Sequence, residues 1–333
     1  MTSFISPSPT RRDVLMLMGS FAALAATSAL AAPTDVKKTT VPKNDDSGFR
    51  ATQVVRNGHR IYVCDYPGSA PTFVMAHGFP DNCQIYKEIA PRLSAAGRRV
   101  VAFDFLGFGR SDKPTDLSYS FDEQVEEMTA VVDGLRLQAV IPVGHDAGGP
   151  AAVNYAISNV DRVAGLALMN CFYSNDPSRA FPDFIELCCN PKTLKLAHAM
   201  MTDPQMAGYL FQFQQDLLMK NMPADLREKF LKQTRPIIAT NFEQQPSAMP
   251  AFLKMTGNAY ANLDANDRRL PELAKFQKPV SLIWGAWDKY LSTSLAREIA
   301  GHFPRAQVIE LQAEHWPQLD RPEEVTEALL ALA

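Results

Sequence analysis

Residues 137–149 read LQAVIPVGHDAGG, an apolar, β-favouring run that ends in a glycine-rich turn. Small residues suited to the start of a helix follow at 150–153. When strand, sharp turn and helix come in this order, a Gly-x-nucleophile-x-Gly pattern puts a reactive side chain at the tip of the turn. Gly144 and Gly148 flank Asp146 in this pattern. We therefore predict that Asp146 is a nucleophile.

An aspartate at position 146 indicates which bonds the protein attacks. A serine there would indicate acyl transfer. A carboxylate attacks saturated carbon instead, displaces an epoxide oxygen or a halide, and leaves an ester on the enzyme. The expected reactants are a small apolar electrophile and water.

Short apolar strands alternate with helical patterns around this turn, which predicts βαβ units and a mostly parallel sheet. The first strand alternates like an antiparallel one. The expected strands are 60–66, 72–76, 99–104, 137–142, 163–169, 280–284 and 307–311, and the expected helices outside the long insertion are 85–96, 121–136, about 150–158 and 323–332.

Between residues 171 and 269 the sequence shows no convincing strand. Helical patterns at 192–201, 205–219 and 224–233 predict an all-helical insertion. We place this cap at 172–269 and the α/β core at 48–171 and 270–333. A cap after the sixth strand can cover a site at the carboxyl ends of the strands and exclude water.

The N-terminal segment predicts export. Arg11 and Arg12 precede a mildly apolar run that ends in the cleavage signal Ala29-Leu30-Ala31. We predict a twin-arginine signal peptide at 1–31 and a polar tail at 32–47, with a periplasmic or secreted mature protein. An uncleaved N-terminal anchor is the alternative.

The composition argues against several classes of protein. Apolar residues make up 46% of the 333 residues, enough for a core, and a net charge of −3 gives no reason to expect nucleic acid. No later stretch is long enough to span a bilayer. The five cysteines show no metal-binding spacing, so buried free thiols are expected, with a disulfide as the alternative. We expect no metal or organic cofactor.

Two further segments carry candidate chemistry. The turn His77-Gly78-Phe79-Pro80 follows a strand and can aim a backbone N–H at an oxyanion, with the Ala147 N–H as a second donor; a plain tight turn is the alternative. His315 follows the last strand and is the expected base. Asp288, after the seventh strand, is the expected acid that orients it, ahead of Glu314. Asn170 holds the other common place for this acid and cannot carry the charge.

Together these motifs resemble the α/β-hydrolase superfamily, in its branch of epoxide hydrolases and haloalkane dehalogenases. The motifs are HGFP at 77–80, GHDAGG at 144–149, WGAWD at 284–288 and EHW at 314–316. The resemblance covers about residues 48–333. It implies an eight-stranded sheet with a cap, Asp146 as nucleophile, His315 as base, Asp288 as its partner, and the N–H groups of Phe79 and Ala147 as the oxyanion hole.

The cap sequence favours epoxide hydrolases within this branch. The stretch around Tyr260, NAYANL at 258–263, looks like the ring-opening motif N-W-Y-R-N-hydrophobic. Tyr209 matches the first tyrosine of the Y-x-x-Y-F-Q motif, and Gln212 replaces the second. Phe79 and Ala147 lack the side-chain donors that hold a leaving halide in dehalogenases. A haloalkane or haloacid dehalogenase remains an alternative, as does a non-catalytic ligand-binding protein on the same fold.

Overall fold

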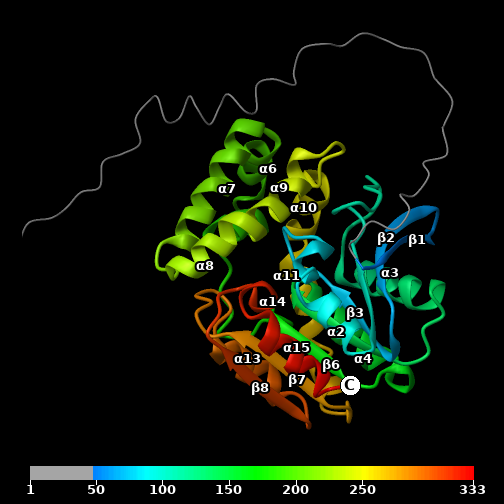
Figure 1. Ribbon diagram of the computed structural model, residues 1–333. Helices are drawn as coiled ribbons and strands as arrows, with labels where there is room; N and C mark the ends of the chain where they lie inside the picture. The colour runs from blue at the N-terminus through cyan, green and yellow to red at the C-terminus, as the bar shows by residue number, and fades with distance from the viewer. Residues whose placement is uncertain (1–47) are drawn as a thin grey trace, which may run out of the picture.

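The computed structural model describes residues 48–333, which form a core around one sheet and a group of helices on one side of it (Figure 1). The strands are β1 (Arg50–Arg56), β2 (His59–Tyr66), β3 (Ser69–Ala76), β4 (Arg98–Phe103), β5 (Val140–Asp146), β6 (Leu166–Cys171), β7 (Val280–Gly285) and β8 (Ala306–Leu311).

The sheet has eight strands in the order β1-β2-β4-β3-β5-β6-β7-β8. β2 pairs antiparallel with β1 and with β4, and the other neighbouring strands run parallel. The expected mostly parallel, eight-stranded sheet is confirmed. β1 has no counterpart among the strands expected from the sequence.

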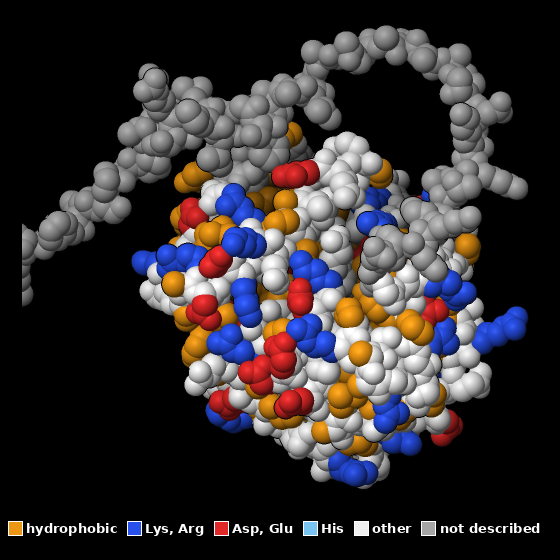
Figure 2. Space-filling model, viewed as in Figure 1, with side chains coloured by type: hydrophobic (Ala, Val, Ile, Leu, Met, Phe, Trp, Pro, Cys, Tyr) orange, Lys and Arg blue, Asp and Glu red, His pale blue; other side chains and the backbone are white. Residues whose placement is uncertain are grey.

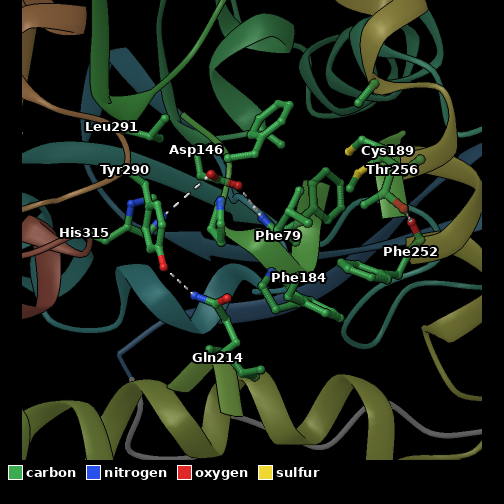
Figure 3. A pocket seen from close by; sticks show the side chains of 18 of the residues that line it. Phe79, Asp146, Phe184, Cys189, Gln214, Phe252, Thr256, Tyr290, Leu291 and His315 are labelled. Carbon is green, nitrogen blue, oxygen red and sulfur yellow. Dashed lines mark hydrogen bonds and ion pairs between the residues drawn. The ribbon is translucent and has the colours of Figure 1, made fainter. Parts of the chain in front are cut away.

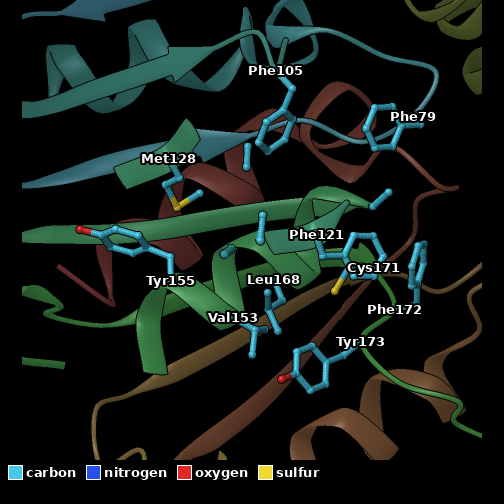
Figure 4. Close-up of a cluster of buried hydrophobic side chains, with 14 of the residues drawn as sticks. Phe79, Phe105, Phe121, Met128, Val153, Tyr155, Leu168, Cys171, Phe172 and Tyr173 are labelled. Carbon is cyan, nitrogen blue, oxygen red and sulfur yellow. The ribbon is translucent and has the colours of Figure 1, made fainter. Parts of the chain in front are cut away.

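Helices cover both faces of the sheet because successive strand residues point to opposite sides. In β3, Val74 belongs to one buried apolar cluster and Phe73 to the other. The helices α3 (Phe121–Gly134), α4 (Gly148–Ser158) and α13 (Thr293–Gly301) contribute to the first cluster. Figure 4 shows part of it, where Val153 of α4 lies beside Leu168 of β6 and Met128 of α3 lies nearer to Tyr155.

The second cluster lies under α2 (Ile89–Ala95) and α15 (Pro322–Leu330), on the opposite face. Short helices complete the core at the strand ends. They are η2 (Cys83–Tyr86), η3 (Val160–Arg162) and α14 (Pro317–Asp320).

The segment between β6 and β7 is helical, as expected for the cap (Figure 1). The predicted helix at 224–233 is part of a longer run, because a π-helical turn, η4, joins two α-helices there. The cap helices are α5 (Asp183–Cys189), α6 (Leu194–Thr202), α7 (Pro204–Met219), α8 (Ala224–Lys229), η4 (Phe230–Thr234), α9 (Arg235–Glu243), α10 (Met249–Gly257), α11 (Ala259–Asp267) and α12 (Leu270–Leu273).

One buried asparagine of α9 fastens the cap to the loop after β3. Asn241 donates to the carbonyls of Pro80 (2.6 Å) and Asp81 (2.7 Å), and its amide oxygen accepts from the Gly109 N–H at 2.8 Å. Its side chain is fully buried. The cap is therefore tied to the same loop that contains Phe79.

The predicted signal peptide (1–31) and tail (32–47) lie outside the described residues and stay predictions. Within residues 48–333, no helix is long and apolar enough to cross a membrane. Basic and acidic side chains are interspersed on the face shown in Figure 2. All five cysteines are buried free thiols, and the sulfur atoms of Cys64 and Cys83 are 3.9 Å apart.

We expect Asn241→Ala to lower the free energy of unfolding by about 2–4 kcal/mol, because it leaves two carbonyls and one N–H unpaired in a buried place. Chemical denaturation measures this change. The control is Asn221→Ala, an exposed asparagine of the same cap, which should change stability by less than about 0.5 kcal/mol. Equal effects of the two variants would show that Asn241 does not fasten the cap.

Candidate active site

The carboxylate of Asp146 stands on a strained turn between β5 and α4. Its backbone has φ +49°, a left-handed conformation that costs energy for a residue other than glycine. The turn is tight: a Cβ atom at Gly144 would come within 2.7 Å of the Gly148 carbonyl oxygen. The structure thus has the strand, turn and helix that the sequence predicts around residue 146.

The loop after β3 brings a backbone donor to this carboxylate. The Phe79 N–H donates to Asp146 Oδ1 at 2.9 Å. Gly78 allows this approach, because a Cβ there would lie 2.4 Å from the Cβ of Asp146. His77 is buried and supports the loop: its Nε2 accepts from the Phe105 N–H, so Nδ1 donates to the Gly78 carbonyl. His77 therefore has a structural role in this loop.

His315 and Asp288 meet at the carboxyl edge of the sheet. His315 Nδ1 lies 2.6 Å from Asp288 Oδ2, and His315 Nε2 lies 3.7 Å from Asp146 Oδ2. Asn170, at the end of β6, donates to Asp288 Oδ2 at 3.0 Å. Asn170 thus occupies the alternative place for the catalytic acid, but its role is to position Asp288 by this hydrogen bond. Glu314 is directed elsewhere and lines a separate hollow with Trp287.

The charges of these groups are interdependent. Burial disfavours a charged His315, but the carboxylates of Asp288, Asp146 and Asp81 outweigh it and raise the pKa of His315 to about 9. Burial also raises the pKa of Asp146, an effect that His315 and the N–H groups of Phe79 and Ala147 reduce. The pKa of Asp288 is lowered despite burial, chiefly by His315. At neutral pH this favours an imidazolium between carboxylates.

A buried polar group that sequence reasoning missed supports the His315 loop. His145 Nε2 contacts the His315 carbonyl oxygen at 2.8 Å. The Trp316 indole N–H donates to Asp81 Oδ2 at 2.9 Å, and His145 Nδ1 lies 3.6 Å from the same oxygen. The sequence signal for this role of His145 was its position in the motif, directly before the predicted nucleophile.

A cavity of about 120 Å³ opens above Asp146, between the core and the cap. Its walls are largely aromatic and aliphatic, as Figure 3 shows for Phe79, Phe184 and Phe252. The polar side chains that line it are Asp146, Gln214, Gln215, Thr256, Tyr290 and His315. Within residues 48–333, no cluster of His, Cys, Asp and Glu is arranged to hold a metal ion.

The two tyrosines predicted in the cap do not line this cavity. Tyr209 is 65% exposed on α7 and stacks on Phe213, so its hydroxyl is directed to solvent. The Tyr260 hydroxyl donates to Glu186 Oε2 at 2.7 Å and so joins α11 to α5. The structure therefore does not bring Tyr209 and Tyr260 to the cavity as predicted, because sequence motifs do not define how the cap helices are rotated.

Tyr290 and Gln214 line the cavity instead. Sequence reasoning gave neither residue a role, although Gln214 stands at the last position of the Y-x-x-Y-F-Q motif. The Gln214 amide donates to the Tyr290 hydroxyl at 3.1 Å (Figure 3). The sequence offered one signal that Tyr290 lies in the site, namely its position two residues after Asp288.

Comparison with known proteins gives consistent results. The α/β hydrolase fold family matches residues 71–322. The chain is 26% identical over 290 residues to haloalkane dehalogenase 2 of Mycobacterium tuberculosis, covering 81% of this chain and 90% of that one. It is 27% identical over 292 residues to epoxide hydrolase 3 of Xenopus tropicalis, covering 80% and 72%.

Solved structures agree on the fold. The haloalkane dehalogenase DatA from Agrobacterium tumefaciens C58 superposes with a TM-score of 0.64 at 21% identity, over 87% of this chain and 100% of that one. At this identity the likeness concerns the fold alone.

We expect Asp288→Asn to lower the pKa of His315 from about 9 by about 1–3 pH units, because the closest anion is removed. NMR titration of labelled histidine side chains measures this, with His59 as an internal control. An unchanged His315 titration would mean that Asp288 does not hold the proton on His315.

Proposed function

Since this chain is a hydrolase of the α/β-hydrolase fold family, we propose that it opens epoxides to vicinal diols through an ester on Asp146. The observation that carries the proposal is the Asp146 carboxylate itself. It stands at the end of β5, faces an apolar cavity, and directs Oδ2 toward His315 while Oδ1 accepts the Phe79 N–H. An oxygen that remains free can attack a carbon atom bound in the cavity.

The two oxygens of Asp146 suit different parts of the reaction. Oδ1 already accepts the Phe79 N–H. This oxygen becomes the carbonyl oxygen of the ester, and the same N–H would stabilise its negative charge when water attacks the ester. Oδ2 lies toward His315 Nε2 and is the proposed attacking oxygen. The ester would then form within reach of a water molecule next to His315.

The electrostatics explain how one histidine serves both steps. In the resting protein the charged His315 favours an ionised Asp146. Ester formation removes the charge of Asp146, which is one of the causes that raise the pKa of His315. The pKa of His315 therefore falls when a base is needed, and the imidazole can take a proton from the attacking water. Asp288 keeps the ring in place throughout.

A dehalogenase reaction is the second candidate, because some of the relatives are named haloalkane dehalogenases. A halide leaves as a stable anion and is held by weak donors. In this cavity the Trp316 N–H is already bound to Asp81, and Phe79 and Ala147 offer no side-chain donor. The cavity does contain a phenol, which suits an oxygen that must be protonated. We therefore favour the epoxide.

The proposal is tested with purified protein, styrene oxide and 1-bromobutane, by measuring diol and bromide release side by side. A single turnover in ¹⁸O-water separates mechanisms. If water attacks the ester carbonyl, the label enters Asp146 and the first diol is unlabelled. A labelled first diol would show direct attack by water on the epoxide and would overturn the ester. Bromide release without diol would favour the dehalogenase.

We expect His315→Gln to accumulate the ester, because attack by Asp146 needs no base whereas hydrolysis of the ester does. Intact-protein mass spectrometry should show an added mass equal to that of styrene oxide, located on the peptide that contains Asp146. The exposed cap variant His198→Gln is the matched control and should show no lasting adduct. Loss of activity without an adduct would place His315 in an earlier step.

We expect Asp146→Ala to reduce diol formation by about 10⁴-fold or more, as is typical when a nucleophile is removed. Circular dichroism and the melting temperature should show an intact fold. Substantial remaining turnover in this variant would contradict covalent catalysis.

A further inference from the structure

Opening an epoxide leaves negative charge on the ring oxygen, and that oxygen needs a proton. The tyrosines expected to supply it, Tyr209 and Tyr260, lie outside the cavity. The donor must therefore be sought among the side chains that line the cavity above Asp146.

Most polar hydrogens of this cavity are already committed or weakly acidic. The Thr256 hydroxyl donates to the Phe252 carbonyl at 2.8 Å, and the Trp316 N–H donates to Asp81. Burial raises the pKa of the Cys189 thiol far above its ordinary range. Tyr290 is the one phenol among the residues that line the cavity.

The main chain of Tyr290 is held by the same carboxylate that holds His315. Its N–H donates to Asp288 Oδ1 at 2.9 Å, and its carbonyl accepts from the Ala180 N–H at 3.3 Å. The Lys289 ammonium lies 4.9 Å from the centre of the Tyr290 ring and is attracted to the electron-rich ring face. Tyr290 is thus fixed relative to the base and placed near a cation.

The pairing with Gln214 leaves the phenol hydrogen free. Gln214 is a nearly buried side chain of α7, and its Nε2 donates to the Tyr290 hydroxyl oxygen at 3.1 Å. A hydroxyl that accepts in this way has its own hydrogen available for another acceptor. Among the described residues the Tyr290 hydroxyl accepts from Gln214 and donates to no recorded acceptor, and Gln214 Oε1 is buried without a hydrogen-bond partner.

We propose that Tyr290, oriented by Gln214, donates the proton to the oxygen that leaves the epoxide carbon. The phenol lines the cavity from the core side and Gln214 reaches it from the cap, so the donor site is complete only when the cap is in place (Figure 3). This inference rests on the proposed epoxide hydrolysis and names the acid for its first step.

The protons balance over one turnover. Asp146 Oδ2 bonds to carbon, the ring C–O bond breaks with its electron pair going to oxygen, and Tyr290 gives that oxygen a proton. The proton that His315 releases when the ester forms returns to the Tyr290 oxygen. Water then adds to the ester carbonyl and gives its proton to His315. The ester bond breaks, and the released oxygen takes the remaining hydroxyl proton, which restores the Asp146 carboxylate.

The test measures ester formation alone, in the His315→Gln background, where the ester is not hydrolysed. Styrene oxide is mixed with the protein and the adduct is followed over time by mass spectrometry. Adding Tyr290→Phe should slow ester formation by about 10²–10⁴-fold, the usual effect of losing a general acid. Adding Gln214→Leu instead should slow it by about 10-fold or more, because the hydroxyl loses its hydrogen-bond donor.

Tyr260→Phe and Tyr209→Phe in the same background are the matched controls, since each removes one phenol hydroxyl outside the cavity. Both should form the ester at the parent rate. If the Tyr290→Phe variant forms the ester at the parent rate, the proposal for Tyr290 is overturned. The same holds if Tyr260→Phe slows ester formation as much as Tyr290→Phe does. No ester in the parent His315→Gln protein would instead overturn the proposed function. If the Tyr290→Phe variant does not fold, Gln214→Leu provides the test. An unchanged rate of ester formation in that variant would overturn the proposal that Gln214 orients Tyr290.

Discussion

The left-handed backbone at Asp146 is the constraint on which the rest of the site depends. A residue with φ +49° at the end of a parallel strand cannot continue that strand, so its side chain projects from the carboxyl edge of the sheet. The cost of this conformation is offset by the packing of β5 and α4 around it. The approach of the Phe79 N–H follows from the same turn, because glycine at position 78 leaves room for the carboxylate.

The second constraint is charge. Three carboxylates, Asp288, Asp146 and Asp81, act on one imidazole, and burial raises the pKa of Asp81 to about 7. A fourth carboxylate at the end of β6 would face Asp288 and repel it. Asn170 avoids this, since its amide donates to Asp288 while its oxygen accepts from the Gly285 N–H. The asparagine that looked like a missing acid in the sequence is thus the neutral partner that an already anionic site requires.

The core of the site was predictable from the sequence because each of its residues follows a strand by a short turn. Asp146 ends the buried strand β5, Asp288 follows the buried strand β7, and His315 follows the partly exposed strand β8. Parallel strands bring such ends together. β1 was missed because only Val54 and Arg56 of its seven residues are buried, as suits a strand at the edge of the sheet. The contact of His145 with Asp81 was missed because the motif marks His145 but not its partner, which lies far away in the sequence.

The cap was harder to interpret because a helix presents a residue to the cavity only at the right rotation. On α7, Ala207, Phe211 and Gln214 follow the spacing of one helical face, and that face is turned toward the core and cavity. Tyr209 stands two residues from Ala207, which at 100° per residue places it on the opposite side. A motif match defines neighbours along the chain but not this rotation, which packing against the core determines. The same helix therefore offers an exposed tyrosine where the motif suggested an acid. It places in the cavity the last glutamine of that motif, Gln214, to which the sequence analysis assigned no role. A short loop tied to Asp288 leaves Tyr290 far less freedom, so a donor from the core side can be placed more reliably than one from the cap.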